Sequence, residues 1–150
     1  MKKVLFVCIG NCCRSQIAEG FARFLGSDLI EVASAGISPT ETVSSDTIAT
    51  MAEAGYDISD QFPKEIDQRS ARNYDIIVNM SGFELPPMEK PLILEWDVQD
   101  PYYEDANVFR EVREHIRERV TELIEDIRND RVVSYKTRKP KLWDRLTSWR

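Results

Sequence analysis

The sequence is poor in the residues from which metal sites and disulfide frameworks are built. It contains one histidine, His115, and three cysteines, Cys8, Cys12 and Cys13, which all lie in one short segment. Cysteines so close together cannot cross-link distant parts of a fold, and their spacing matches no common zinc site. An iron–sulfur pattern fails as well, because Ser15 stands where the next cysteine would be needed. We therefore expect no metal centre and no disulfide framework.

Long apolar runs are also absent. The sequence has no run of about 18 apolar residues, so we expect no transmembrane helix. Residues 1–3 lead straight into an apolar segment that is too short for the core of a secretory signal peptide. These two absences predict a cytoplasmic protein. A chain of 150 residues with 42% hydrophobic residues is expected to fold as one domain without covalent staples.

Charge is distributed unevenly along the chain. The formal net charge is −6, but residues 131–150 carry seven basic side chains and one acidic side chain, a local charge of +6. The preceding 130 residues therefore carry −12. An acidic body of this kind argues against nucleic acid as a substrate or partner, whereas a phosphate-sized anion needs only a local positive site.

The hydrophobic pattern predicts strands that alternate with helices. Short runs rich in β-branched residues indicate strands at residues 3–7, 29–35, 74–80 and 92–96. Helical spacing of apolar residues indicates helices at residues 15–25, 45–54 and 107–129, with a further turn after Pro63. This alternation predicts an α/β fold, a three-layer α/β/α sandwich with a four-stranded parallel sheet. Residues 1–130 are expected to form this domain.

Residues 8–15, with the sequence Cys-Ile-Gly-Asn-Cys-Cys-Arg-Ser, join the first strand to the first helix. A loop in this place points several backbone N–H groups at one spot, with the positive end of a helix dipole behind them. That field favours the thiolate of Cys8, which is the nucleophilic form of cysteine. The planar fork of Arg14 matches two oxygens of a tetrahedral anion. The sequence therefore predicts a phosphate-binding loop after the first strand.

Three other residues of this loop have roles that follow from their types. Gly10 permits a tight turn, and Asn11 tolerates a left-handed backbone conformation. Ser15 is placed either to donate a hydrogen bond to the Cys8 sulfur or to cap the helix, and both roles are compatible.

A carboxyl group for proton transfer is expected at the same edge of the sheet. Ligands of parallel sheets bind at the carboxyl ends of the strands, where Cys8, Asn79 and the segment 97–103 would all emerge. Asp100 is the general acid that we expect, and it would protonate the oxygen that leaves during attack by Cys8. On its own, an Asp-Pro pair is more typical of a turn. Asp100 becomes a candidate general acid only in combination with the phosphate-binding loop.

Residues 7–15, followed by Ile17-Ala18-Glu19, resemble the signature of the low-molecular-weight protein tyrosine phosphatases. They are equally similar to the arsenate reductases that share this fold, including the thioredoxin-linked members. The likeness extends over roughly residues 1–130, and the later segment Asp100-Pro101-Tyr102-Tyr103 matches as well.

The resemblance assigns roles to individual residues. It implies Cys8, Arg14 and Asp100 as catalytic residues, and it favours Asp100 over the nearby Asp97 and Asp105. It implies Tyr102 and Tyr103 as the walls of a slot for an aromatic ring, and Cys13 as a redox partner of the nucleophile. The phosphate-binding residues that it implies are Ile9, Gly10, Asn11, Cys12, Cys13, Arg14 and Ser15.

The main functional prediction is a phosphatase of the protein-tyrosine-phosphatase type. Cys8 would form a cysteinyl-phosphate intermediate on a phosphotyrosine-containing protein or a small aryl phosphate, without a metal or cofactor. One departure concerns residues 37–46, where phosphatases of this family often carry an aromatic residue and this chain carries none.

The alternative is an arsenate reductase, because arsenate has almost the shape of phosphate. Its second step requires a thiol to attack the Cys8-bound arsenic and leave a disulfide. Thioredoxin-linked members use cysteines near the end of the third strand for this step, whereas residues 79–82 of this chain read Asn-Met-Ser-Gly. Only an external thiol could then complete the reaction. A phosphate-binding module without catalysis is disfavoured because both Cys8 and Asp100 are present.

Residues 131–150 form a basic extension with Leu142, Trp143, Leu146 and Trp149 on one helical face. Such an amphipathic segment fits a partner protein, a second subunit or this protein's own acidic body, or an anionic membrane surface.

Overall fold

The computed structural model of the protein describes residues 1–132. Most of the basic extension, residues 133–150, lies outside the described residues, so its predicted role stays a prediction. Among residues 1–132 no helix has the length and apolar character that a membrane span requires.

The core of the fold is a four-stranded parallel sheet with the strand order β2-β1-β3-β4. The strands are β1 (Lys2–Cys8), β2 (Ile30–Gly36), β3 (Ile76–Asn79) and β4 (Leu92–Glu95). The register pairs Cys8 with Gly36 and Val7 with Asn79, so these three strands end at the same edge. The predicted fold class and strand number are confirmed.

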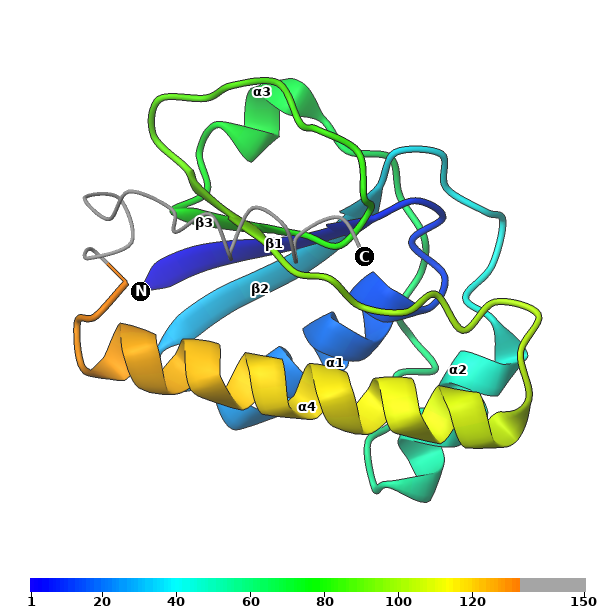
Figure 1. Cartoon of the computed structure of the whole chain (residues 1–150). Helices are drawn as coiled ribbons and strands as arrows, with labels where there is room; N and C mark the ends of the chain where they lie inside the picture. Colours follow the sequence, from blue (N-terminus) through cyan, green and yellow to red (C-terminus); the bar gives the residue numbers. More distant parts are fainter. Residues whose placement is uncertain (133–150) are drawn as a thin grey trace.

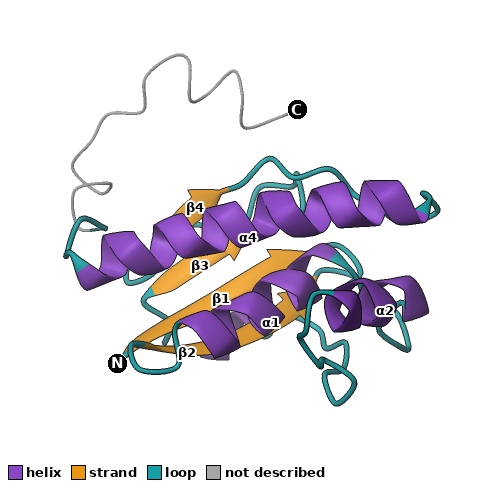
Figure 2. Cartoon of the chain, turned by 90° about the horizontal axis from the view of Figure 1, so that it is seen from below, coloured by secondary structure: helices purple, strands orange, loops and turns teal. Residues whose placement is uncertain are grey.

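Helices cover both faces of the sheet (Figures 1 and 2). One face is covered by α1 (Arg14–Leu25), α2 (Ser45–Glu53) and the long α4 (Ala106–Arg128). The short α3 (Gln68–Ala71) and its flanking loops cover the other face. Three of the helices begin with side-chain caps. Ser44 accepts a hydrogen bond from the Thr47 amide, Asp67 accepts one from the Arg69 amide, and Asp105 accepts one from the Val108 amide.

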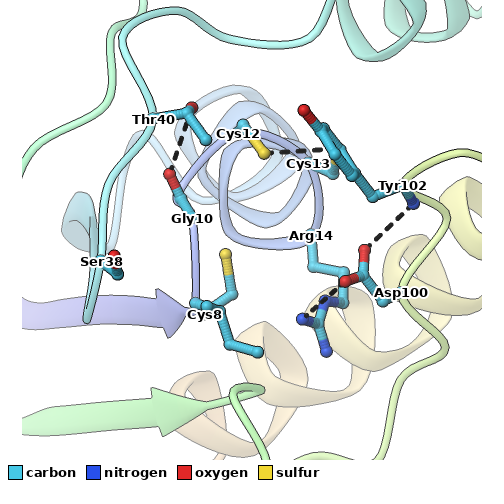
Figure 3. Close-up of a pocket in the computed structure, with 10 residues that line it drawn as sticks. Cys8, Gly10, Cys12, Cys13, Arg14, Ser38, Thr40, Asp100 and Tyr102 are labelled. Carbon is cyan, nitrogen blue, oxygen red and sulfur yellow. Dashed lines mark hydrogen bonds and ion pairs between the residues drawn. The ribbon is translucent and has the colours of Figure 1, made fainter.

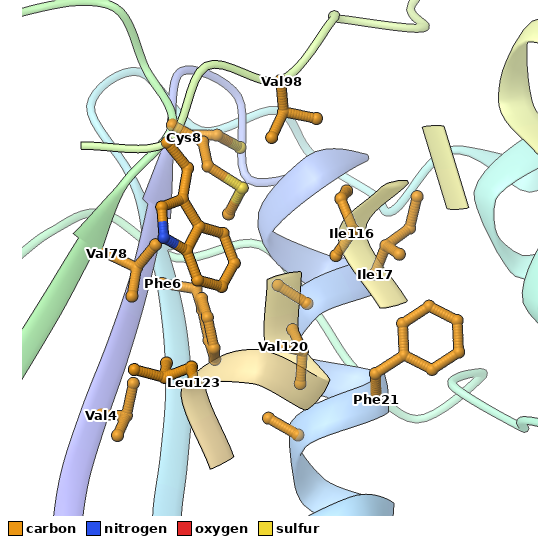
Figure 4. Close-up of a cluster of buried hydrophobic side chains, with 14 of the residues drawn as sticks. Val4, Phe6, Cys8, Ile17, Phe21, Val78, Val98, Ile116, Val120 and Leu123 are labelled. Atoms are coloured by element: carbon orange, nitrogen blue, oxygen red, sulfur yellow. The ribbon is translucent and has the colours of Figure 1, made fainter. Parts of the chain in front are cut away.

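The alternation of side chains along β1 decides on which side of the sheet the nucleophile lies. Leu5 and Val7 point into the smaller core beneath α3. Val4, Phe6 and Cys8 point into the larger core, and Figure 4 shows Cys8 at its upper end. The helices contribute buried residues to this core, namely Ile17, Phe21, Ile116, Val120 and Leu123. Cys8 is therefore fixed between a well-packed core and the carboxyl edge of the sheet.

Truncation of a core residue of α4 tests this packing. Ile116 is fully buried against the larger core, so Ile116→Ala should lower the free energy of unfolding by about 2–5 kcal/mol. Glu118→Ala on the exposed face of the same helix is the matched control, and it should change stability by less than about 0.5 kcal/mol. Urea unfolding followed by circular dichroism measures both. Equal effects of the two substitutions would contradict the described burial.

Candidate active site

A cavity of about 190 Å³ opens at the carboxyl edge of the sheet, above the end of β1 (Figure 3). Three segments far apart in the sequence line it: the loop after β1, the loop after β2 and the loop after β4. The lining residues are Cys8, Ile9, Gly10, Cys12, Cys13, Arg14, Ser38, Thr40, Asp100 and Tyr102. The structure thus brings together the predicted nucleophile, the predicted anion loop and the predicted general acid.

The anion loop is held in shape from beneath by Asn11. Its backbone is left-handed, with φ of 50°, and its side chain is fully buried. The side-chain oxygen accepts a hydrogen bond from the Lys64 amide at 3.0 Å, and the backbone oxygen accepts one from Gln16 at 3.0 Å. These contacts fix a conformation that costs energy for a residue other than glycine.

Hydrogen bonds around Cys8 have a defined direction. The Cys8 sulfur lies 2.8 Å from the Ser15 hydroxyl, and geometry alone allows either atom to donate. The Asn11 amide nitrogen, however, donates to the same Ser15 oxygen at 2.7 Å. Ser15 is therefore an acceptor toward Asn11 and is free to donate its own proton to Cys8. A hydrogen bond donated to sulfur stabilises the thiolate over the thiol.

A buried carboxylate fixes the far end of this network. The Asn11 amide also donates to the Ser34 hydroxyl at 2.9 Å, and Ser34 donates to Glu19 at 2.7 Å. Glu19 is almost fully buried and pairs with Arg23 at 2.6 Å. The Asn11 amide donates in both directions, to Ser15 toward Cys8 and to Ser34 toward Glu19, where the carboxylate is the final acceptor. Glu19 is thus linked to Cys8 through three intervening residues.

Arg14 connects the loop to two other segments. One guanidinium nitrogen, Nη1, donates to the backbone oxygen of Met80 at 2.7 Å and to that of Val98 at 3.3 Å. The other, Nη2, lies 3.5 Å from the Asp100 carboxylate. The guanidinium is nine-tenths buried, so its orientation is set by these contacts while it lines the cavity. Arg14 thereby places Asp100 beside the anion loop.

Cys12 and Cys13 form a second pair of thiols in the same loop, with their sulfurs 3.8 Å apart. A hydrogen bond from Cys13 lowers the pKa of Cys12 to about 7, against the opposing effect of burial. The same hydrogen bond, together with burial, raises the pKa of Cys13. The pair therefore shares one proton near neutral pH, with the charge on Cys12.

The two predicted slot residues differ in position. Tyr102 lines the cavity, and its amide donates to Asp100 at 3.1 Å. Tyr103 is 94% exposed and lines an adjoining cavity, with its ring packed edge-on against Tyr102. Their role as walls for an aromatic ring stays a prediction.

Comparison with known proteins identifies the fold family. The model of the low molecular weight phosphotyrosine protein phosphatase family matches residues 3–90 and 88–133. The chain belongs to this family. A solved structure of a low molecular weight protein tyrosine phosphatase from T. tengcongensis has 29% sequence identity and a TM-score of 0.72, over 84% of this chain and 99% of that one.

Within the family, the relatives with higher identity are reductases. A glutaredoxin arsenate reductase from Synechocystis sp. is 42% identical over 131 residues, which is 85% of this chain and 99% of the relative. A solved arsenate reductase in its phosphate-binding state has a TM-score of 0.78 at 42% identity, over 85% of this chain and 99% of that one.

The prediction of a phosphotyrosine phosphatase is therefore wrong, and its alternative is better supported. The structure supplies a physical reason. The loop after β2 contributes Ser38 and Thr40 to the cavity, which are small and polar, and one of the two expected aromatic walls lies outside it.

Sequence reasoning missed several residues of the site. Ser38 and Thr40 were not predicted as site residues, although they follow the strand that pairs with β1 and so had to emerge at the same edge. Ser34 was not predicted either, because its role depends on how β1 pairs with β2. Among residues 1–132 no group of three or more histidine, cysteine, aspartate or glutamate side chains is arranged to hold a metal ion.

Gly36 is a point where the loop can be tested. A Cβ atom at this position would lie 2.7 Å from the Ile9 carbonyl oxygen and 2.9 Å from two atoms of Asn11. Gly36→Ala should therefore displace the loop, weaken the binding of phosphate or arsenate, and lower stability by about 1–3 kcal/mol. Calorimetric titration with phosphate, combined with thermal unfolding, measures both effects. Unchanged anion affinity would show that the loop does not depend on this close approach.

The ionisation of Cys12 gives a pH-dependent prediction. Only the thiolate is alkylated, so the rate of Cys12 modification by iodoacetamide should rise with pH and reach half its maximum near pH 7. A thiol with the ordinary pKa of 9.0 would reach half its maximum rate of modification only near pH 9. Peptide mass spectrometry of the quenched reaction measures this rate at Cys12 alone. In Cys13→Ser the pH at which Cys12 modification reaches half its maximum rate should change, because a hydroxyl group replaces the thiol that donates to Cys12.

Proposed function

We propose that this protein is an arsenate reductase that takes its electrons from an external thiol system. The observation that carries the proposal is the 42% identity to a glutaredoxin arsenate reductase, which covers 85% of this chain and 99% of that relative. The site chemistry supports it, since the anion loop, Cys8 and Arg14 suit a tetrahedral oxyanion of the size of arsenate.

In the first step, the Cys8 thiolate attacks the arsenic of arsenate. A sulfur–arsenic bond forms and an arsenic–oxygen bond breaks, and Asp100 supplies the proton with which the oxygen leaves as water. The amides of the loop and Arg14 hold the remaining oxygens while charge develops on them. Ser15 is placed to donate a hydrogen bond to the Cys8 sulfur during the attack.

In the second step, an external thiolate attacks the Cys8 sulfur. The sulfur–arsenic bond breaks and its electron pair stays on arsenic, which leaves as arsenite, while Cys8 forms a mixed disulfide. A second thiol then attacks that disulfide and releases the Cys8 thiolate. Two thiols are thus oxidised to one disulfide for each arsenic that is reduced by two electrons.

The distribution of cysteines explains why the electrons must come from outside. Cys8 ends β1, and the other two cysteines, Cys12 and Cys13, lie in the loop that follows it. At the end of β3, where the thioredoxin-linked reductases of the resembled group carry cysteines, this chain has Met80, Ser81 and Gly82. Since no internal thiol lies on that side of Cys8, we propose glutathione and a glutaredoxin as the electron donors.

The test is an assay of arsenite formation from arsenate with glutathione, glutaredoxin, glutathione reductase and NADPH. We expect thiol-dependent arsenite production that is abolished in Cys8→Ser. Asp100→Asn should lower the rate by about 10²–10⁴-fold, because the leaving oxygen then lacks its acid. Asp97→Asn, three residues earlier in the same loop, is the matched control and should keep the rate.

Two results would overturn the proposal. One is hydrolysis of aryl phosphates without any thiol-dependent arsenite production. The other is full activity with thioredoxin and none with glutathione and glutaredoxin, which would place the electron donor in another class.

A further inference from the structure

The two thiols next to the nucleophile have a chemistry of their own. We infer that Cys12 and Cys13 form a dithiol site that binds trivalent arsenic, separate from the attack of Cys8 on arsenate. The sulfurs of the pair are 3.8 Å apart, and both residues line the cavity above Cys8 (Figure 3). This inference goes beyond the proposed function and does not depend on turnover.

The spacing of the two sulfurs suits one small thiophilic atom. Trivalent arsenic is a soft acid that prefers thiolate ligands to oxygen. Arsenous acid would react with the two thiols to give a cyclic dithioarsenite, in which two arsenic–sulfur bonds replace two arsenic–oxygen bonds and two waters leave. The oxidation states of arsenic and sulfur do not change, so no other reactant is needed. The third ligand of arsenic remains a hydroxyl group.

The environment of the pair lowers the pKa of Cys12 and raises that of Cys13, so the Cys12 proton is lost near neutral pH and the Cys13 proton leaves when arsenic takes its place. Cys12 already carries the charge near neutral pH, because Cys13 donates a hydrogen bond to it. When arsenic takes the place of that proton, the sulfur of Cys13 still has a polar neighbour in Thr47. The Thr47 hydroxyl is fully buried and has no hydrogen-bond partner within residues 1–132. The hydrogen bond to Cys12 and burial raise the pKa of Cys13, and the nearby Thr47 hydroxyl partly opposes this rise.

Access and enclosure are both present at the pair. Phe109 of α4 packs against the two cysteines and shields them on one side. Cys12 lines the cavity of about 190 Å³ above Cys8, and also an adjoining cavity of about 340 Å³ beside Tyr103. A small arsenical therefore reaches the sulfurs from the cavity while Phe109 excludes water from behind. Arsenite that is released at Cys8 would meet this pair before it meets bulk solvent.

The test uses phenylarsine oxide, whose arsenic has two valences for thiols, on the Cys8→Ser variant. This variant keeps only Cys12 and Cys13 as thiols, because the chain has three cysteines in all. We expect intact mass spectrometry to show one molecule of phenylarsine oxide bound per protein chain. Ellman's reagent should then detect neither of the two thiols. Cys12→Ser should bind at least about 10²-fold more weakly, since only chelation by a neighbouring sulfur holds the arsenic firmly.

Other outcomes would overturn the inference. If Cys8→Ser bound no arsenical, or if Cys12→Ser bound it as tightly as the unaltered protein, the pair would have to include Cys8. Thermal unfolding with and without phosphate shows whether each variant keeps its fold and loop, and Cys12→Ala is a second form of the same deletion. Because Cys8→Ser cannot turn over arsenate, a failed reductase assay and a failed binding assay are distinguishable.

Discussion

The hydrogen bond from Ser15 to the Cys8 sulfur is the interaction on which the rest of the site depends. It exists in a single direction because Asn11 already donates to Ser15, and Asn11 is oriented in turn by Ser34, Lys64 and Gln16. The last member, Glu19, is a carboxylate buried in the first helix and neutralised by Arg23. A buried charge without partners is destabilising. The Glu19 carboxylate has partners in Arg23 and Ser34, and it serves as the terminal acceptor of the network.

The parallel sheet explains why so few residues suffice to build the site. The four parallel strands end at one edge, and the loops after β1, β2 and β4 contribute to the same cavity. Arg14 then joins these loops through Met80, Val98 and Asp100. One side chain thus gives the site its positive charge and also fixes the positions of its walls, so the electrostatics and the shape of the cavity cannot vary independently.

The fold was predictable from the sequence because its signals are local and agree with one another. The apolar run before Cys8, the helical spacing after Ser15 and the long stripe through Ile116 and Val120 each require one type of element. The proximity of Cys8 and Asp100 was also predictable, because the carboxyl ends of parallel strands lie at the same edge of the sheet. The network through Ser34 and Glu19 did not, because it depends on the register of β1 against β2. The loop also could not decide between a phosphatase and a reductase, since arsenate and phosphate have almost the same shape.

The segment after β3 is held by its own side chains. Asn79 donates to the Phe83 carbonyl oxygen at 2.7 Å, Ser81 donates to Asn79 at 2.6 Å, and the Phe83 amide donates to Ser81 at 3.1 Å. A reductase that carried its electrons on this segment would have to break these bonds in every cycle to deliver a sulfur to Cys8. Under the proposed function, in which a diffusing thiol supplies the electrons, this segment can keep its hydrogen bonds throughout the cycle.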